Sequence, residues 1–327
     1  MKWRINMNVR VVIFSHNYFE LCTRKTLDSD FIDTYFSGVK ELARNFESVT
    51  KEVSIVYGID EFKEDITKSN NTIYFSTWNY LGTRNQKSIF ISLCQAYHAQ
   101  YIGADQYLQT VGQDKMLSKM IANQFNIAAP PAIRIDKVED IKDLAIPFSK
   151  SILKPIYEGE SIGINLGVQT SNEELISNAN QLLLNSNDSI MIERFVNGTE
   201  YNICLFIDSK NQLKTSVVKV NDYEQDGLYN YEKKRIVDKY SKKYDLYNLN
   251  EVFNDYQIQN ITNLFYHFKD NKFLRIDGFL DINKKFWLLE ITQTPGIYPN
   301  SSFVHGMRKC GYTYSDFLKE LILTSIQ

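Results

Sequence analysis

The sequence predicts an α/β protein whose first third holds a parallel sheet and whose remainder mixes strands and helices in the α+β manner. Three observations predict this fold class. The chain has 327 residues, which corresponds to two or three domains. Apolar residues make up 43% and charged residues 23%, an ordinary globular composition. Short apolar runs alternate with segments of helical period along the first third, which is typical of βαβ units.

The N-terminal section, residues 1–113, predicts the parallel sheet. The run VRVVIFS at 9–15 is apolar enough for a buried strand. Apolar residues in 30–46 recur every three or four positions, which is the period of a helix. We therefore expect strands at 9–15, 53–57 and 72–78, and helices at 30–46 and 88–99.

The middle section, residues 114–198, begins with a predicted helix at 114–125. Pro130 and Pro131 follow it and prevent its continuation. Ser171 and Glu174 form a capping-box pattern, which marks the start of a second helix. We expect strands at 132–135, 151–155 and 189–196.

The last section, residues 199–327, predicts a second set of strands. The residues at 282–285 are typical of a hairpin turn. Segment 221–247 is rich in Tyr, Lys, Asp and Asn and poor in aliphatic residues, so we expect a long loop or lid there. The predicted strands are 200–207, 215–220, 273–281 and 286–291, and the predicted helices are 250–268 and 314–324.

Composition excludes several classes of protein. A formal net charge of −2 argues against general binding of nucleic acid or acidic membranes. The four cysteines are far apart and form no CxxC pair, which favours reduced thiols over a zinc site or a disulfide framework. The N-terminus lacks the apolar core of a signal peptide, and no apolar run is long enough to cross a membrane. We therefore expect a cytoplasmic protein.

The strongest chemical pattern lies in the last two predicted strands. Arg275 and Asp277 share one face by the period of two, and so do Glu290 and Thr292. If the hairpin pairs these faces, two carboxylates, a hydroxyl and a guanidinium converge. Hard oxygen ligands of this kind suit Mg²⁺ on nucleotide phosphates, and a guanidinium stabilises developing negative charge. A surface hairpin with exposed charges is the alternative interpretation.

Two weaker patterns also indicate a nucleotide site. Lys154 ends an apolar strand and precedes a loop that contains Gly159 and Gly163, so its ammonium and the loop N–H groups can bind phosphates. The strand that ends near Glu193 can present backbone groups to an adenine edge, with an acidic side chain further on for the ribose. Taken alone, each pattern fits a plainer interpretation better, namely a solvated lysine and a simple hairpin.

In this order the motifs resemble the ATP-grasp superfamily, most closely the D-alanine–D-alanine ligases, from roughly Tyr101 to the C-terminus. The segments that extend the resemblance are Tyr101-Ile102-Gly103-Ala104, Asp114-Lys115 and Pro295-Gly296-Ile297-Tyr298-Pro299-Asn300-Ser301-Ser302. The resemblance implies an ATP-grasp fold in three parts. They are an N-terminal pre-ATP-grasp domain at 1–113, a central subdomain at 114–198, and a C-terminal subdomain with metal site and lid at 199–327.

The resemblance also implies a role for each matched residue. Contacts to ATP would come from Lys115, Lys154, Glu193, Arg194, Val196, Glu200 and Lys234. One or two Mg²⁺ ions, replaceable by Mn²⁺, would be held by Asp277, Glu290 and Thr292. Arg275, Lys234 and Ser301 would act in catalysis, and Ser301 and Ser302 would bind the acceptor.

The chain departs from the family pattern mainly on the amino-acid side of the site. Thr292 stands where the family usually has Asn, a better ligand for a second ion. Glu160 replaces a serine of the lysine loop, and the N-terminal signatures give way to stretches that contain His16 and Trp78. We therefore expect Glu160, Trp78 and His16 to contact a substrate other than D-alanine.

The predicted function is an ATP-dependent ligase. It would activate a carboxylate as an acyl-phosphate and join it to an amine, with release of ADP and phosphate. Its expected partners are a small carboxylic acid, such as an amino acid, and an amine, and the resemblance suggests a homodimer. Two alternatives stay open, a thiol acceptor on a carrier protein or coenzyme A, and a catalytically weak nucleotide-binding module.

Overall fold

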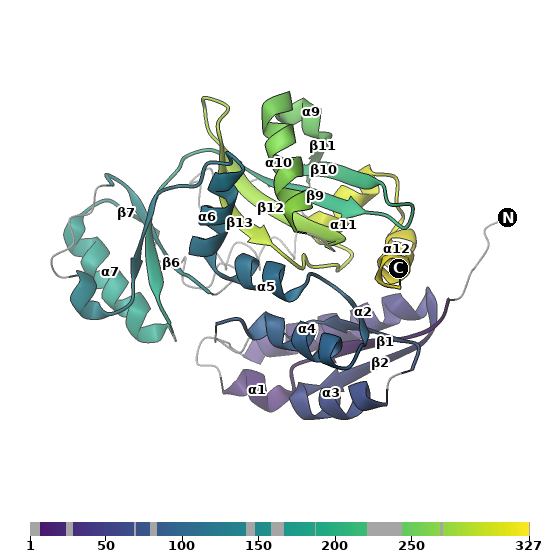
Figure 1. Cartoon of the computed structure of the whole chain (residues 1–327). Helices are drawn as coiled ribbons and strands as arrows, with labels where there is room; N and C mark the ends of the chain where they lie inside the picture. Colours follow the sequence, from purple (N-terminus) through teal and green to yellow (C-terminus); the bar gives the residue numbers. More distant parts are fainter. Residues whose placement is uncertain are drawn as a thin grey trace.

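The computed structural model describes residues 7–23, 29–68, 70–78, 84–141, 148–157, 167–186, 188–220, 244–268 and 271–326. Within these ranges the strands form three sheets, one in each predicted section of the chain. Figure 1 shows the central sheet with α7 set to one side, and the other two sheets stacked one above the other. None of the described helices is long and apolar enough to span a membrane.

The N-terminal sheet has the strand order β2-β1-β3-β4, and every pair in it is parallel. This confirms the predicted parallel sheet. Its strands are β1 (Met7–Ser15), β2 (Thr50–Tyr57), β3 (Thr72–Ser76) and β4 (Gln100–Ile102), and its helices are α1 (Tyr18–Cys22), α2 (Ser29–Glu47), α3 (Gly58–Thr67) and α4 (Gln86–Ala96).

The central sheet has the order β5-β8-β6-β7 with antiparallel pairs. Two helices lead to it, and they meet at Asp114, which ends the first and caps the second through hydrogen bonds from the N–H groups of Met116 and Leu117. The elements are α5 (Gln106–Gln113), α6 (Lys115–Gln124), β5 (Ala132–Ile135), η1 (Val138–Ile141), β6 (Ser151–Pro155), β7 (Val168–Gln169), α7 (Asn172–Asn185) and β8 (Ile190–Arg194).

The C-terminal sheet has the order β11-β10-β9-β12-β13, again antiparallel. Its elements are β9 (Thr199–Ile207), β10 (Leu213–Lys219), β11 (Asp245–Tyr247), α9 (Leu249–Val252), α10 (Asp255–His267), β12 (Phe273–Leu280), β13 (Phe286–Thr292), α11 (Ser302–Lys309) and α12 (Tyr314–Ser325).

Two predictions for this section are wrong in detail. Residues 245–247, predicted as part of the loop, form β11 and pair with β10. The predicted helix at 250–268 is two helices, because the side chain of Asn254 accepts a hydrogen bond from the N–H of Gln257 and starts a new helix there. The rest of the predicted lid, 221–243, lies outside the described residues.

The largest hydrophobic core joins the two ends of the chain. Val11 of β1 and Phe46 of α2 belong to the same buried cluster as Phe303 of α11 and Phe317 of α12. α12 packs against β4, so the last helix covers the N-terminal sheet, as Figure 1 shows. The domain boundaries at 113 and 198 remain predictions.

Candidate active site

The hairpin of β12 and β13 brings four predicted site residues together. Arg275 pairs with Thr292 and Asp277 pairs with Glu290, so both faces predicted from the period of two coincide. The guanidinium of Arg275 donates to both carboxylate oxygens of Asp277, at 2.6 and 2.7 Å. The hydroxyl of Thr292 donates to Asp277 at 3.0 Å. The register confirms that these groups converge, and the alternative of an exposed surface hairpin is wrong because Asp277 is only 2% exposed.

The guanidinium of Arg275 and the carboxylates of Asp277 and Glu290 affect one another's pKa values. Burial raises the pKa of Asp277, and the bidentate hydrogen bond from Arg275 opposes that rise. Burial alone would lower the pKa of Arg275, but Asp277 and Glu290 raise it well above its ordinary value. The guanidinium therefore stays charged at neutral pH.

The start of α11 completes the cluster. Arg275 donates from Nη1 to the hydroxyl of Ser302 at 3.1 Å. Ser301 is the N-cap of the helix, and its hydroxyl accepts a hydrogen bond from the N–H of Val304 at 3.3 Å. Both predicted acceptor-binding serines thus lie beside the guanidinium, Ser302 by direct contact and Ser301 as its chain neighbour.

The three predicted metal ligands fit one hard divalent ion better than two. Asp277 and Glu290 are cross-strand neighbours, and two carboxylates with substrate phosphate oxygens form a common Mg²⁺ environment. The hydroxyl of Thr292 points its proton at Asp277, so it is committed to that carboxylate. In the part of the chain that is described, no group of three or more His, Cys, Asp and Glu side chains could hold a metal ion by itself.

A second cluster lies in the central subdomain, where Glu193 is bound by two lysines. Lys154 forms an ion pair with one carboxylate oxygen and Lys119 with the other, at 2.5 Å for Lys119. All three side chains are at most 6% exposed. Burial alone would raise the pKa of Glu193, but the two ammonium groups outweigh it and hold that pKa below the ordinary value. Burial lowers the pKa of Lys119, against the attraction of Glu193.

Sequence reasoning identified Lys154 and Glu193 but missed Lys119. The available signal was its spacing, because Lys119 lies four residues after Lys115 and so shares a face of α6 with it. The ammonium of Lys115 donates to the carbonyl oxygens of Pro155 and Ile156, at 3.0 and 3.4 Å. Lys115 and Lys154 therefore both lie at the end of β6, which supports their predicted phosphate contacts.

The remaining predicted nucleotide residues lie along the link from β8 to β9. The guanidinium of Arg194 lies 4.7 Å from the centre of the Trp287 ring, which joins the central sheet to β13. Val196 is half-buried in the link itself, and Glu200 pairs with Phe279 in the C-terminal sheet. Lys234 and Glu160 lie outside the described residues.

The N-terminal domain contributes a buried polar cluster around Glu20. Its carboxylate is 2.9 Å from Nδ1 of His16 and accepts a hydrogen bond from Nε1 of Trp78 at 3.1 Å. His16 has no exposed surface, so the expectation that it contacts the substrate is corrected: it lies in the core of the domain. Sequence reasoning missed Glu20, whose signal was the capping box it forms with Asn17 at the start of α1.

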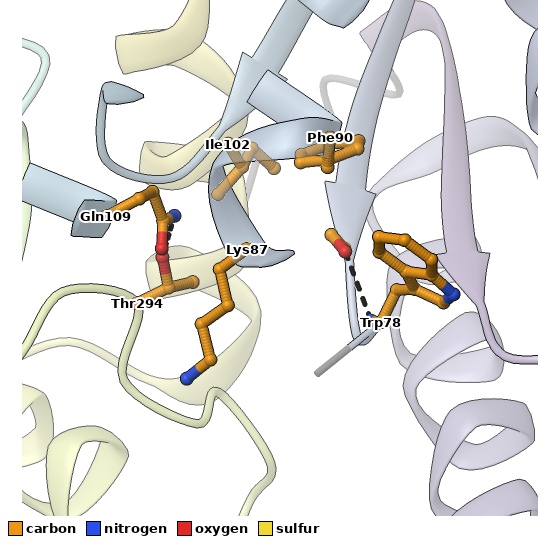
Figure 2. Close-up of a pocket in the computed structure, with 7 residues that line it drawn as sticks. Trp78, Lys87, Phe90, Ile102, Gln109 and Thr294 are labelled. Atoms are coloured by element: carbon orange, nitrogen blue, oxygen red, sulfur yellow. Dashed lines mark hydrogen bonds between the residues drawn. The ribbon is translucent and has the colours of Figure 1, made fainter. Parts of the chain in front are cut away.

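Trp78 borders a hollow between the N-terminal sheet and the C-terminal subdomain, shown in Figure 2. The hollow has a volume of about 290 Å³, open solvent included. Its lining residues are Ser76, Trp78, Lys87, Phe90, Ile102, Gln109 and Thr294. Trp78 is only 4% exposed, and its predicted substrate role remains a prediction.

Arg84 joins the N-terminal domain to the central subdomain, a contact that sequence reasoning also missed. Its guanidinium donates to both carboxylate oxygens of Asp188, at 2.9 and 3.0 Å, and lies 4.9 Å from the centre of the Tyr157 ring. The hydrogen bonds from Arg84 lower the pKa of Asp188 to about 2. The hydroxyl of Tyr157 accepts a hydrogen bond from Arg134 at 2.9 Å, which anchors the ring.

Comparison with known proteins shows that the sequence of this chain is similar to those of ligases. Residues 135–323 match the family model described as D-ala D-ala ligase C-terminus. The D-alanine–D-alanine ligase of Buchnera aphidicola subsp. Baizongia pistaciae is 26% identical over 242 residues, which cover 71% of this chain and 74% of that protein. The enzyme of the same name from Wigglesworthia glossinidia brevipalpis is 26% identical over 255 residues, with 75% and 69% covered.

Solved structures share the fold over almost the whole chain. The D-alanyl-alanine synthetase A of Vibrio cholerae superposes with a TM-score of 0.71 at 15% identity and covers 98% of both chains. The D-alanine–D-alanine ligase of Bacillus anthracis complexed with ATP gives 0.67 at 15% identity and covers 97% of both. The predicted ATP-grasp architecture with an N-terminal parallel sheet is thereby confirmed.

Proposed function

The chain belongs to the D-alanine–D-alanine ligase family of ATP-dependent carboxylate–amine ligases, and from this premise we propose that it joins amino acids other than a pair of D-alanines. The observation that carries the catalytic part is the buried network of Arg275, Asp277, Thr292 and Ser302 at the hairpin of β12 and β13. The change of substrate is supported by the sequence, because the stretches that contain His16 and Trp78 depart from the family signatures on the amino-acid side of the site.

The reaction proceeds in two balanced steps. A carboxylate oxygen of the first substrate attacks the γ-phosphorus of ATP, the bond to the β–γ bridging oxygen breaks, and ADP leaves. The amine of the second substrate then attacks the acyl carbon, the carbon–oxygen bond to phosphate breaks, and the amine loses a proton. Positioning and charge neutralisation account for most of such catalysis, so no nucleophilic side chain is required.

Three groups of this chain supply the positive charge. Lys115 and Lys154 lie at the end of β6, where they bind the nucleotide phosphates. Because Glu193 balances only one of its two lysine partners, the cluster keeps one net positive charge for an anionic ligand. Arg275 carries its guanidinium between Asp277 and Ser302, where it stabilises the acyl-phosphate and the tetrahedral intermediate that follows.

Asp277 and Glu290 would hold one Mg²⁺ ion, which neutralises charge on the phosphates during transfer. Thr292 orients the Asp277 carboxylate through its hydrogen bond rather than serving as a ligand of a second ion. Ser301 and Ser302 place the acceptor beside Arg275 through their position at the start of α11. The homodimer that the resemblance implies remains a prediction that light scattering of the purified protein tests.

Substrate-dependent release of ADP tests the proposal. Purified protein is incubated with ATP, Mg²⁺ and pools of D- and L-amino acids, and ADP, AMP and phosphate are quantified. We expect ADP and phosphate to appear only with amino acids. AMP with pyrophosphate would refute the acyl-phosphate route, and turnover with D-alanine alone would refute the change of substrate.

Two variants relate the activity to the hairpin. Asp277→Asn removes a predicted metal ligand and should abolish ADP release while ATP still raises the melting temperature. Asp60→Asn, at a side chain that is 96% exposed on α3, is the matched control and should retain full activity. Equal activity of both variants would exclude Asp277 from the reaction centre.

A further inference from the structure

Residues 293–300 link the two parts of the reaction centre. The link begins after β13, whose last residue is Thr292, and ends before Ser301 and Ser302, which start α11. The predicted metal ligands lie before the link and the predicted acceptor serines lie after it. The conformation of the link therefore determines where the acceptor lies relative to the metal-binding carboxylates.

Gln109 of α5 binds the start of this link. Its side-chain amide donates a hydrogen bond to the hydroxyl of Thr294 at 2.9 Å, and Figure 2 shows the pair. Gln109 is only 4% exposed, so solvent competes little for its amide. Thr294 follows Thr292 by two residues, and two residues of chain span at most about 7 Å. A shift of Thr294 is therefore transmitted directly to the end of β13.

α5 lies in direct contact with the end of β13. A Cβ atom added to Gly112 would be 2.7 Å from the carbonyl oxygen of Ile291, which is closer than van der Waals contact allows. Only glycine at this position permits so close an approach of the helix to the strand. Gly112 lies three residues after Gln109, so both residues occupy the same face of α5. The face that contacts β13 is therefore also the face that binds Thr294.

α5 is itself fixed to the next helix. The hydroxyl of Ser118 in α6 donates to the carbonyl oxygen of Val111 at 2.6 Å, across the junction at Asp114. Asp114 caps α6, whose first residue is Lys115, one of the predicted phosphate-binding lysines. Gln109 therefore belongs to a rigid pair of helices that connects the nucleotide side of the site with the acceptor side.

A second contact fixes the middle of the link. The hydroxyl of Tyr314 donates to the carbonyl oxygen of Ile297 at 2.8 Å, and Ile297 is buried in the largest core. Gln109 holds the part of the link that precedes Ile297. Loss of the bond to Gln109 would therefore release the chain next to β13 without unfolding the rest of the link.

We propose that Gln109 is a positioning residue of the ligase reaction. Through Thr294 it keeps the end of β13 and the start of α11 in the relative position that brings the acceptor amine to the acyl carbon. This inference rests on the proposed function and adds to it a residue that acts through another side chain.

The expected effect is on turnover and not on nucleotide binding. A displacement of about 1 Å at the reacting groups costs up to about 100-fold in rate, so we expect loss of the bond to lower kcat by roughly 10- to 100-fold. The KM for ATP should change less than about threefold, because Asp114 and Ser118 still hold α5 and Lys115 in place.

The test uses variants that keep the shapes of the two side chains. Gln109→Met keeps the approximate length and removes the donor. Thr294→Val keeps the shape and removes the acceptor, whereas Thr294→Ser retains the acceptor. Tyr74→Phe is the control, because it removes a hydrogen bond of 2.8 Å to Asp65 in the N-terminal domain. ADP release is measured with ATP, Mg²⁺ and an equimolar mixture of D- and L-amino acids at varied total concentration.

Thermal unfolding separates a loss of activity from a loss of structure. Gln109→Met and Tyr74→Phe each lose one hydrogen bond, so each should lower the melting temperature by roughly 1–3 °C, and ATP should raise it in both. We expect kcat to fall in Gln109→Met and in Thr294→Val and to stay near the wild-type value in Tyr74→Phe and Thr294→Ser. The double variant Gln109→Met with Thr294→Val should match the slower single variant within about threefold, because both substitutions remove the same bond.

A wild-type kcat in Gln109→Met would overturn this inference and leave the ligase function standing. A loss in Thr294→Ser equal to that in Thr294→Val, or losses that multiply in the double variant, would do the same. Absence of ADP release by the wild type would instead overturn the proposed function, and this inference with it.

Discussion

Replacement of Glu193 by Gln should destabilise the protein strongly, because Glu193 is the sole counter-charge in its cluster among the described residues. The substitution keeps the shape of the side chain and removes its charge. Two ammonium groups, those of Lys119 and Lys154, then face each other at 6% and 5% exposure. The new carboxamide can accept a hydrogen bond from one lysine, but its NH₂ group points at the other.

The magnitude follows from the burial of all three groups. Breaking a buried ion pair by removing one partner costs about 3–5 kcal/mol, because an uncompensated charge remains in the interior. For a chain of this length each kcal/mol lowers the melting temperature by roughly 1.5–2 °C, so we expect a decrease of roughly 5–10 °C.

The pH dependence provides a second signature. A lysine whose pKa is lower in the folded than in the unfolded state destabilises the protein, and the full penalty applies at pH values below its folded-state pKa. The penalty disappears as the pH rises from the folded-state pKa to the unfolded-state pKa. Burial lowers the pKa of Lys119 in the wild type, and loss of Glu193 lowers it further. The stability deficit of Glu193→Gln should therefore shrink as the pH is raised from neutral toward 10.

The assay is urea unfolding followed by circular dichroism at several pH values. Glu139→Gln, at an exposed position of the same subdomain, is the control and should change the unfolding free energy by less than about 0.5 kcal/mol. The double variant Glu193→Gln with Lys119→Met removes one of the two like charges and should recover part of the loss. A Glu193→Gln deficit below about 1 kcal/mol, independent of pH, would show that the ion cluster is not buried as described.

Four further substitutions test three other contacts. Arg275→Lys removes the bidentate hydrogen bond to its aspartate, so kcat for ADP release should fall at least about 100-fold while the KM for ATP changes little; a large rise in that KM would contradict a catalytic role. Asp188, with a pKa of about 2, contributes stability above the unfolded pKa that is lost as pH falls through the range from about 4 to 2. In Asp188→Asn and in Arg84→Gln the unfolding free energy should no longer fall by this contribution as the pH is lowered. Acid titration of the unfolding free energy measures this, and curves parallel to the wild type would count against the contact. In Gly278→Ala the new Cβ would collide with the carbonyl oxygen of Trp287, so we expect a loss of about 1–3 kcal/mol in urea unfolding, and an unchanged midpoint would mean that the hairpin yields there.

The hairpin chemistry was predictable from sequence because it depends on local rules. Period-two alternation places Arg275 with Asp277 and Glu290 with Thr292, and a short turn leaves few ways to pair the two strands. The parallel N-terminal sheet was predictable for the same reason, since apolar strands alternate with helices there. The break at Asn254 could also have been predicted, because Asn254 and Gln257 form a capping box. The helical period of 250–268 had favoured a single helix instead.

Other site features depend on contacts between distant parts of the chain. Lys119 of α6 and Glu193 of β8 come together only in the folded chain, and their distance along the sequence does not predict that they form an ion pair. Arg84 and Asp188 are 104 residues apart. His16 can be buried because its Nδ1 lies within hydrogen-bond distance of the Glu20 carboxylate, which also accepts a hydrogen bond from the indole of Trp78.

The shared core of the two chain ends has a consequence for synthesis on the ribosome. The N-terminal sheet is complete once β4 has emerged, but α12, which covers it and contributes Phe317 to its core, is made last of the described helices. At 5–20 residues per second the intervening chain requires roughly 10–45 s. During that time the nascent sheet exposes the apolar face that Phe317 will cover, so this part of the core can close only after α12 has left the ribosome.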